Sequence, residues 1–288
     1  MHIALHLGAH CTDEGRLIGT LRANFDHLRA EGTVVPRPRG ARIAFRKAIQ
    51  RSRTEEKGAA TPALVSELTS GEATDRVVVG QEDFLGTPDT ALAGARLYPQ
   101  AGQRAAEIRK LLSGQTLQFF LSIRNPATFV PALFDLSKET AFDRFVPAPD
   151  LSSLIWSDTV RAIRTASPDV PLTVWCNEDL PLIWPDVLRT LAGRDTPLVG
   201  EDAILAEVMT PEGYGRLKAY LRDNPPASLA TWHRVVTAFL AKYADEAKLD
   251  EEIRVPDWTE GIIAGLSDLY EKDVARIAAM DDVTLIQP

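Results

Sequence analysis

Five side chains that could act as metal ligands, nucleophiles or acid–base groups fall between positions 6 and 14. They are His6, His10, Cys11, Asp13 and Glu14, within the segment HIALHLGAHCTDEGRLIG at residues 2–19. Imidazole, thiolate and carboxylate groups are good ligands for zinc or iron. The same segment begins as a short apolar strand that runs into a glycine-containing turn, which is typical of a phosphate-binding loop at the start of a helix. The segment therefore indicates a nucleotide site, a metal site, or a site that has lost its chemistry.

The metal and nucleophile alternatives meet physical objections. His2 and His6 would share one face of a strand, but at strand rise they lie about 13 Å apart, too far for one ion. A thiolate at Cys11 would be favoured by a helix N-terminus and by the adjacent His10, whereas Asp13 and Glu14 raise the pKa of this thiol. We therefore predict no metal site, and the reactivity of Cys11 stays open.

The elements that must position these residues follow from apolar periodicity. Four apolar segments predict buried strands, at residues 2–8, 75–86, 116–126 and 170–181, and shorter extended pieces follow at 33–38 and 283–288. Helical spacing predicts one helix over 15–30, others near 39–53, 102–112, 129–140 and 154–166, and a series of helices after residue 184. Strands that alternate with helices predict a single α/β domain over 1–288, with a mostly parallel sheet and a helical C-terminal portion.

Polar residues follow each of the four predicted strands. They lie at 8–15, 81–83, 124–126 and 177–179. Because ligands bind beyond the carboxyl ends of parallel strands, we expect these segments to form one edge of the sheet that carries the site.

Composition narrows the class of partner. The chain has 288 residues and a formal net charge of −8, which argues against nucleic-acid binding. Residues 37–57 are locally basic, so this segment either binds an anionic glycan, polymer or protein, or is a solvated helix face. The sequence has only two cysteines, which are far apart, and it has no basic leader, so we predict a cytoplasmic protein. It also has no apolar run of about 18 residues, so we predict no transmembrane segment.

Several segments, taken in order, carry a resemblance to a known family. They are HLGAHCT (6–12), VVVGQEDFLG (77–86), LSIRNPATFVPALF (121–134), VPLTVWCNEDLPLIWPDVL (170–188) and VPDWTEGIIAGLSDLYEKDVARIAAM (255–280). Together they resemble the bacterial sulfotransferase-like P-loop proteins, whose first loop has the pattern H-[IL]-G-x-H-K-T-[GA]-T-T and whose third strand ends in R-[DN]-P. The resemblance implies a P-loop, three-layer α/β fold of the sulfotransferase type.

The resemblance also implies a reaction and a set of site residues. The family transfers a sulfuryl group from 3′-phosphoadenosine 5′-phosphosulfate to a hydroxyl or amine. Arg124 matches the arginine that binds the 3′-phosphate, and Glu82 takes the place of the base, with His10 as a second candidate. The loop that would hold the 5′-phosphosulfate comprises Gly8, Ala9, His10, Cys11 and Thr12.

The chain departs from the family pattern where the donor should bind. Cys11 stands where the family has its lysine, Asp13, Glu14 and Gly15 replace Gly-Thr-Thr, and Ala132 replaces a serine eight residues after Arg124. At about 4 Å and an effective dielectric constant near 20, each added carboxylate repels a phosphate charge by about 4 kcal/mol. The sequence therefore predicts a disabled donor loop.

Two functional hypotheses follow. The first is a divergent family member that acts by binding and does not use the sulfate donor. The second is an active sulfotransferase in which Arg16 folds back to hold the donor with Arg124, and Glu82 is the base. Arg124 could instead pair with Asp13, Glu14 or Glu82, and the direction of the two loop carboxylates distinguishes the hypotheses.

Overall fold

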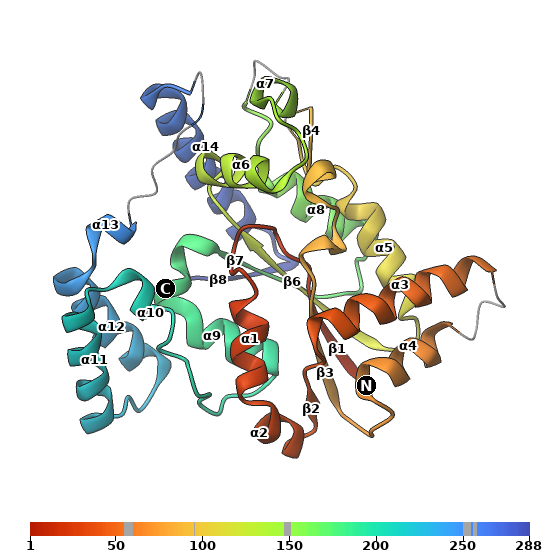
Figure 1. The fold of residues 1–288 in the computed structure, drawn as a ribbon, viewed down its shortest axis with the longest axis horizontal. Coiled ribbons are helices and arrows are strands. Elements are labelled where there is room, and N and C mark those ends of the chain that lie inside the picture. The colour runs from red at the N-terminus through yellow and green to blue at the C-terminus, as the bar shows by residue number, and fades with distance from the viewer. Residues whose placement is uncertain (55–59, 95, 147–150, 250–254, 256–257) are drawn as a thin grey trace.

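The computed structural model describes residues 1–54, 60–94, 96–146, 151–249, 255 and 258–288. The last three positions of the basic segment, 55–57, and residues 256 and 257 of the last motif lie outside the described residues. The described part has helices on both sides of a central sheet, so the predicted three-layer α/β class is confirmed (Figure 1).

The central sheet has six strands, and every pairing described between them is parallel. In spatial order they are β2 (Thr33–Val34), β3 (Arg76–Gly80), β1 (His2–His6), β6 (Thr116–Ile123), β7 (Leu172–Cys176) and β8 (Val283–Ile286). Ile3 of β1 lies opposite Val77 on one side and Leu117 on the other, so β1 is buried between neighbours. Strands that are covered on both faces have nearly continuous apolar sequences, which explains why these strands could be predicted from the sequence.

Alternate residues of the central strands point to two separate cores. Ile3 and Leu5 face a larger core, whereas Ala4 between them faces a smaller one. The helices that supply the larger core are α3 (Pro38–Thr54), α4 (Ala60–Thr69), α5 (Ala101–Leu111), α6 (Pro126–Leu136), α7 (Phe142–Phe145), α8 (Trp156–Ala166) and α14 (Glu260–Ala278).

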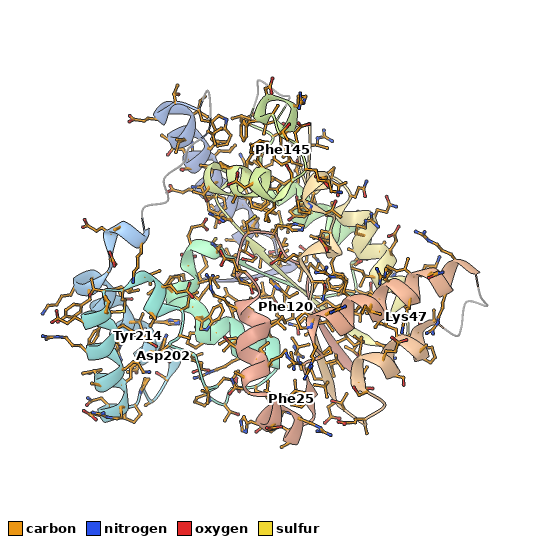
Figure 2. The ribbon with its side chains drawn as sticks, viewed as in Figure 1. Phe25, Lys47, Phe120, Phe145, Asp202 and Tyr214 are labelled. Atoms are coloured by element: carbon orange, nitrogen blue, oxygen red, sulfur yellow. The ribbon has the colours of Figure 1, made fainter. Side chains whose placement is uncertain are left out.

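The second face carries the first helices of the chain and most of the later ones. They are α1 (Arg16–Ala23), α2 (Phe25–Ala30), α9 (Leu180–Ala192), α10 (Leu205–Val208), α11 (Pro211–Asp223) and α12 (Leu229–Tyr243), with α13 (Glu246–Leu249) following α12. Phe120 lies at the centre of the molecule (Figure 2). At one side of the molecule, the Tyr214 hydroxyl of α11 donates a hydrogen bond to Asp202 at 3.2 Å. The predicted helical C-terminal portion is thus confirmed.

Two details of the predicted elements were wrong. The helix expected over 15–30 is interrupted at Asn24, whose side chain donates to the Thr20 and Val199 carbonyls and accepts from the Val199 amide. An asparagine bonded in this way competes with helix continuation. The segment after residue 86 also contains an antiparallel pair, β4 (Leu92–Ala93) and β5 (Arg96–Leu97), which is too short to give a periodic signal.

None of the helices in the described residues is both long enough and apolar enough to cross a lipid bilayer.

Candidate functional site

The loop after β1 lies where the winding of the sheet changes direction. β3 and β2 extend from one side of β1, and β6, β7 and β8 extend from the other. Beyond β1 the chain still follows β6, because the Leu7 and Ala9 amides donate to the Phe120 and Ser122 carbonyls at 2.8 and 3.0 Å. Open α/β sheets bind ligands at this reversal point, so the loop at 8–15 lies where the sequence placed a site.

Gly8 fixes how the loop packs on the neighbouring strand. Its φ is 108°, and a Cβ atom at this position would lie 3.2 Å from the Glu82 carbonyl oxygen. A residue with a side chain would be strained by this backbone conformation and crowded by that contact. The glycine thus brings the loop against the 3-10 helix η1 (Glu82–Phe84), which follows β3.

The Ala9 and His10 amides of the loop, and the Arg16 amide at the start of α1, are bonded to protein acceptors. The Ala9 amide donates to Ser122, and the His10 amide donates to the Tyr98 hydroxyl at 2.9 Å. The Arg16 amide donates to the Asp13 carbonyl at 2.8 Å. The Thr12 hydroxyl also bonds internally, to the Ala9 carbonyl at 2.9 Å. A phosphate-binding loop needs such donors free to face its ligand.

The two consecutive carboxylates of the loop point in different directions. Asp13 is 2% exposed, and its Oδ2 accepts from the Leu17 amide at 2.9 Å, in the first turn of α1. The Glu14 side chain is 71% exposed and pairs with Arg16 at 2.9 Å. Asp13 therefore occupies part of the helix N-terminus at which an anionic ligand would bind, whereas Glu14 lies outside.

Arg16 also forms an ion pair with a second carboxylate, that of Glu207. Its Nε lies 2.9 Å from Glu207 Oε1, at α10. Binding of the donor by Arg16 stays a prediction, and it would require these two ion pairs to be exchanged for ligand contacts.

Arg124, at the end of β6, contacts the loop backbone. Its Nη1 donates to the Cys11 carbonyl at 2.6 Å, and its Nε donates to the Thr128 hydroxyl at 3.0 Å. Arg124 is buried, and its own carbonyl accepts from the Trp156 indole at 2.8 Å. These contacts tie the R-N-P motif to the loop backbone and give the arginine a structural role.

A chain of hydrogen bonds connects Tyr98, His10 and Asp83. The Tyr98 hydroxyl lies 2.7 Å from His10 Nδ1, and His10 Nε2 lies 3.3 Å from Asp83 Oδ1. Because this hydroxyl already accepts from the His10 amide, its proton is available for Nδ1, and Nε2–H can then donate to Asp83. Burial lowers the pKa of His10 below 6.5, which agrees with a neutral ring.

Glu82 lies in a pocket of about 350 Å³ in front of the loop. We call it the acidic pocket, because its charged lining comprises four carboxylates and one arginine, namely Asp13, Glu14, Glu82, Asp83 and Arg42. Burial raises the pKa of Glu82, and the neighbouring Asp13 and Asp83 raise it further. A carboxylate with a raised pKa is a possible proton acceptor, whereas the negative surroundings disfavour a phosphate.

His6 and Cys11 are two further chemical candidates of the sequence; His6 is buried, and Cys11 is partly exposed. His6 is 3% exposed and stacks on Trp175 with ring centroids 5.3 Å apart. Burial lowers the pKa of His6, and it raises the pKa of Cys11 to about 12. A thiol with this pKa is protonated at neutral pH and is a poor nucleophile. Cys11 and Cys176 are both free thiols.

The fourth predicted segment, 177–179, contributes to a different cluster. Glu178 accepts from the Asn125 amide at 2.7 Å and from the Tyr270 hydroxyl at 3.0 Å. Burial raises the pKa of Glu178. This segment therefore connects α6 with α14, and it is absent from the lining of the acidic pocket among the residues that the structure describes.

Sequence reasoning missed Tyr98 and Arg42 as members of the site. Tyr98 lies 88 residues from His10, and nothing in its local sequence indicates the contact. Arg42 of α3 donates to the Gln81 side chain at 3.3 Å and lines the acidic pocket. The basic character of residues 37–57 was the only signal for Arg42, and it did not separate this arginine from its neighbours.

Comparison with known proteins leaves the family assignment untested. No family model matches the chain, and no curated protein gives a significant match. Within the described residues, no group of three or more His, Cys, Asp or Glu side chains is arranged to hold a metal ion. The sulfotransferase-like resemblance thus stays a prediction from sequence motifs.

Proposed function

We propose that this chain is a binding protein on a sulfotransferase-like frame, and that its loop does not hold 3′-phosphoadenosine 5′-phosphosulfate. The observation that carries the proposal is the hydrogen bond from the Leu17 amide to Asp13 Oδ2 at 2.9 Å. The protein's own carboxylate takes a donor that a phosphosulfate loop offers to its ligand.

The electrostatics of the loop support the same proposal. A phosphate at this position would meet buried Asp13 at close range, with Glu82 and Asp83 on the pocket wall. Each carboxylate at about 4 Å repels a phosphate charge by about 4 kcal/mol at an effective dielectric constant near 20. Cys11 supplies no positive charge in place of the family's lysine, and Arg124 bonds to the loop backbone.

An active sulfotransferase is the second candidate, and one observation favours it. Glu82 lies beside His10 and Asp83 in the acidic pocket, and its raised pKa suits a general base. In this alternative Glu82 would take the acceptor's proton, while Arg16 and Arg124 would hold the donor. The loop contacts described above weigh against that donor site. The basic segment at 37–57 remains a proposed surface for an anionic partner, and a cytoplasmic location remains a proposal.

The test is a thermal-shift titration with adenosine 3′,5′-bisphosphate, the desulfated donor, confirmed by calorimetry. We expect no saturable shift up to millimolar ligand. A ligand present at about 100 times its Kd stabilises the folded state by about 2.7 kcal/mol, which raises Tm by several degrees. A saturable rise of this size, lost in Arg124→Lys but retained when exposed Arg161 is changed to Lys, would overturn the proposal.

A further inference from the structure

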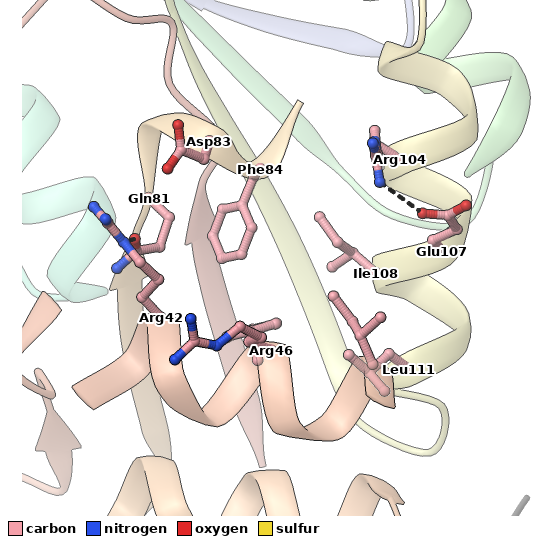
Figure 3. Close-up of a pocket in the computed structure, with 11 residues that line it drawn as sticks. Arg42, Arg46, Gln81, Asp83, Phe84, Arg104, Glu107, Ile108 and Leu111 are labelled. Atoms are coloured by element: carbon pink, nitrogen blue, oxygen red, sulfur yellow. Dashed lines mark hydrogen bonds and ion pairs between the residues drawn. The ribbon is translucent and has the colours of Figure 1, made fainter. Parts of the chain in front are cut away.

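A second pocket opens next to the acidic pocket, between α3, η1 and α5 (Figure 3). Its volume is about 240 Å³, and it shares Arg42, Gln81 and Asp83 with the acidic pocket. The Phe84 ring projects between the two helices, with Ile108 and Leu111 of α5 beyond it. The apolar side chains of its wall are Phe45, Ile49, Phe84, Ile108 and Leu111.

A second and more polar pocket adjoins the first along α3 and α5, and its lining includes Ser52, Arg53 and Lys110. This pocket has a volume of about 270 Å³ and shares Ile49, Glu107 and Leu111 with the first. Ile49 is 42% exposed although it faces both pockets. We call the two pockets together the α3–α5 groove. The apolar wall of its first pocket suits an unbranched apolar chain.

Two arginines of α3 line this groove close to the acidic pocket, where Arg42 also attracts the Glu82 carboxylate. Arg42 and Arg46 are four residues apart on α3, so their side chains leave the same helix face. Within the part of the chain that the structure describes, neither forms an ion pair. By contrast, Lys47 and Arg51 on the same helix both pair with Glu67, at 3.2 and 3.5 Å. On the neighbouring side of α3 two cations therefore share one carboxylate, whereas at the groove no ion pair holds Arg42 or Arg46 among the described residues.

The carboxylates of the groove are already engaged. Glu107 pairs with Arg104 at 3.4 Å, and Asp83 is bonded to His10. Arg104 Nε is buried and has no hydrogen-bond acceptor among the described residues. A bound anion can supply acceptors to these guanidinium groups, since an arginine binds a carboxylate through paired N–H donors.

We propose that the α3–α5 groove binds an amphipathic monoanion, an unbranched alkyl carboxylate, with its carboxylate at Arg42 and Arg46 and its chain over the apolar wall. This inference rests on the proposed binding function, for which it names the class of ligand. An anionic glycan fits less well, because its hydroxyls would lose water against Phe45, Phe84 and Ile108 without gaining hydrogen bonds.

The first experiment is calorimetry with hexanoate, octanoate and decanoate at pH 7. Each methylene that enters the groove should tighten binding about fourfold. Decanol and decyltrimethylammonium have the same chain, and we expect both to bind at least tenfold more weakly than decanoate. The absence of decanoate binding at millimolar concentration, or equal binding of all three head groups, would overturn the proposal.

Matched variants locate the site. The double variant Arg42→Gln/Arg46→Gln should weaken decanoate at least tenfold and leave decanol unchanged. Arg39→Gln removes an exposed arginine of the same helix that does not line the groove, and it should leave both affinities unchanged. All three positions are exposed, so the variants should fold. Equal decanoate affinity in the wild type and the double variant would refute the assignment.

The two proposals fail separately. Binding of adenosine 3′,5′-bisphosphate at the loop would show that the donor site is retained. It would not affect the second proposal if decanoate binding still depended on Arg42 and Arg46. If decanoate does not bind, the proposed class of ligand is wrong, and the proposal that the loop does not hold the donor is unaffected.

Discussion

Tyr98 is the residue on which the position of His10 depends. Tyr98→Phe leaves the buried His10 amide and Nδ1 without this hydroxyl. An unsatisfied buried donor costs about 1–3 kcal/mol, so we expect the free energy of unfolding to fall by about that amount. Urea unfolding measures the change, and Tyr220→Phe, at an exposed tyrosine of α11, should have almost no effect.

The same variant has a second readout. A hydroxyl that donates to Nδ1 stabilises the neutral imidazole, so its removal should raise the pKa of His10. An NMR titration of the imidazole protons follows this change directly. Equal stability and an unchanged His10 titration in Tyr98→Phe would show that the hydrogen bond contributes nothing.

At the residue scale, the sequence indicated which strand ends lie at one edge of the sheet, but it did not indicate the contacts between their side chains. The apolar run before Gly8 and the run before Arg124 correctly indicated two strand ends at one edge. The opposite directions of Asp13 and Glu14 could not be predicted, because they depend on the left-handed backbone at Glu14, φ 49°, and Gly15, φ 77°. The contact of Arg124 with the loop could not be predicted, since its acceptor there is a backbone carbonyl 113 residues away.

At the scale of elements, α8 begins on a carboxylate that belongs to α14. Asp273 is buried, and its Oδ2 accepts from the Trp156 and Ser157 amides at 2.6 and 2.9 Å. Asp273→Ala leaves both amides unsatisfied, so we expect a loss of about 2–4 kcal/mol in the free energy of unfolding. Asp268→Ala, at an exposed position of the same helix, is the control for urea unfolding. A loss below about 0.5 kcal/mol in Asp273→Ala would contradict a stabilising role for this contact.

The elements themselves were the most predictable part of the chain. Parallel strands buried on both faces require continuous apolar runs, and all four main strands were located by such runs. Breaks and caps were less predictable, because they depend on distant partners. Asn24 ends α1 through the Val199 backbone 175 residues away, and Asp273 begins α8 from 117 residues away.

At the scale of the whole molecule, the ionisable groups inside the protein respond to acid in opposite directions. Burial lowers the pKa of His6 and His10 below 6.5, so below that pH the unfolded chain binds protons that the folded protein resists. Burial raises the pKa of Glu82, Glu178 and Asp179, so these groups take up protons more readily when folded. Stability lost through the histidines is therefore partly offset by the carboxylates at lower pH.

The net effect is testable between pH 7.5 and pH 5.5. In this window His6 and His10 become charged in the unfolded chain, so the free energy of unfolding should fall as the pH falls, with a limiting slope of about 1.4 kcal/mol per pH unit for each of these two residues. Urea unfolding at several pH values measures the slope. His6→Gln cannot take up this proton and should have a shallower slope than the wild type. Identical slopes in the wild type and His6→Gln would mean that His6 is as readily protonated in the folded protein as in the unfolded chain, which its burial against Trp175 argues against.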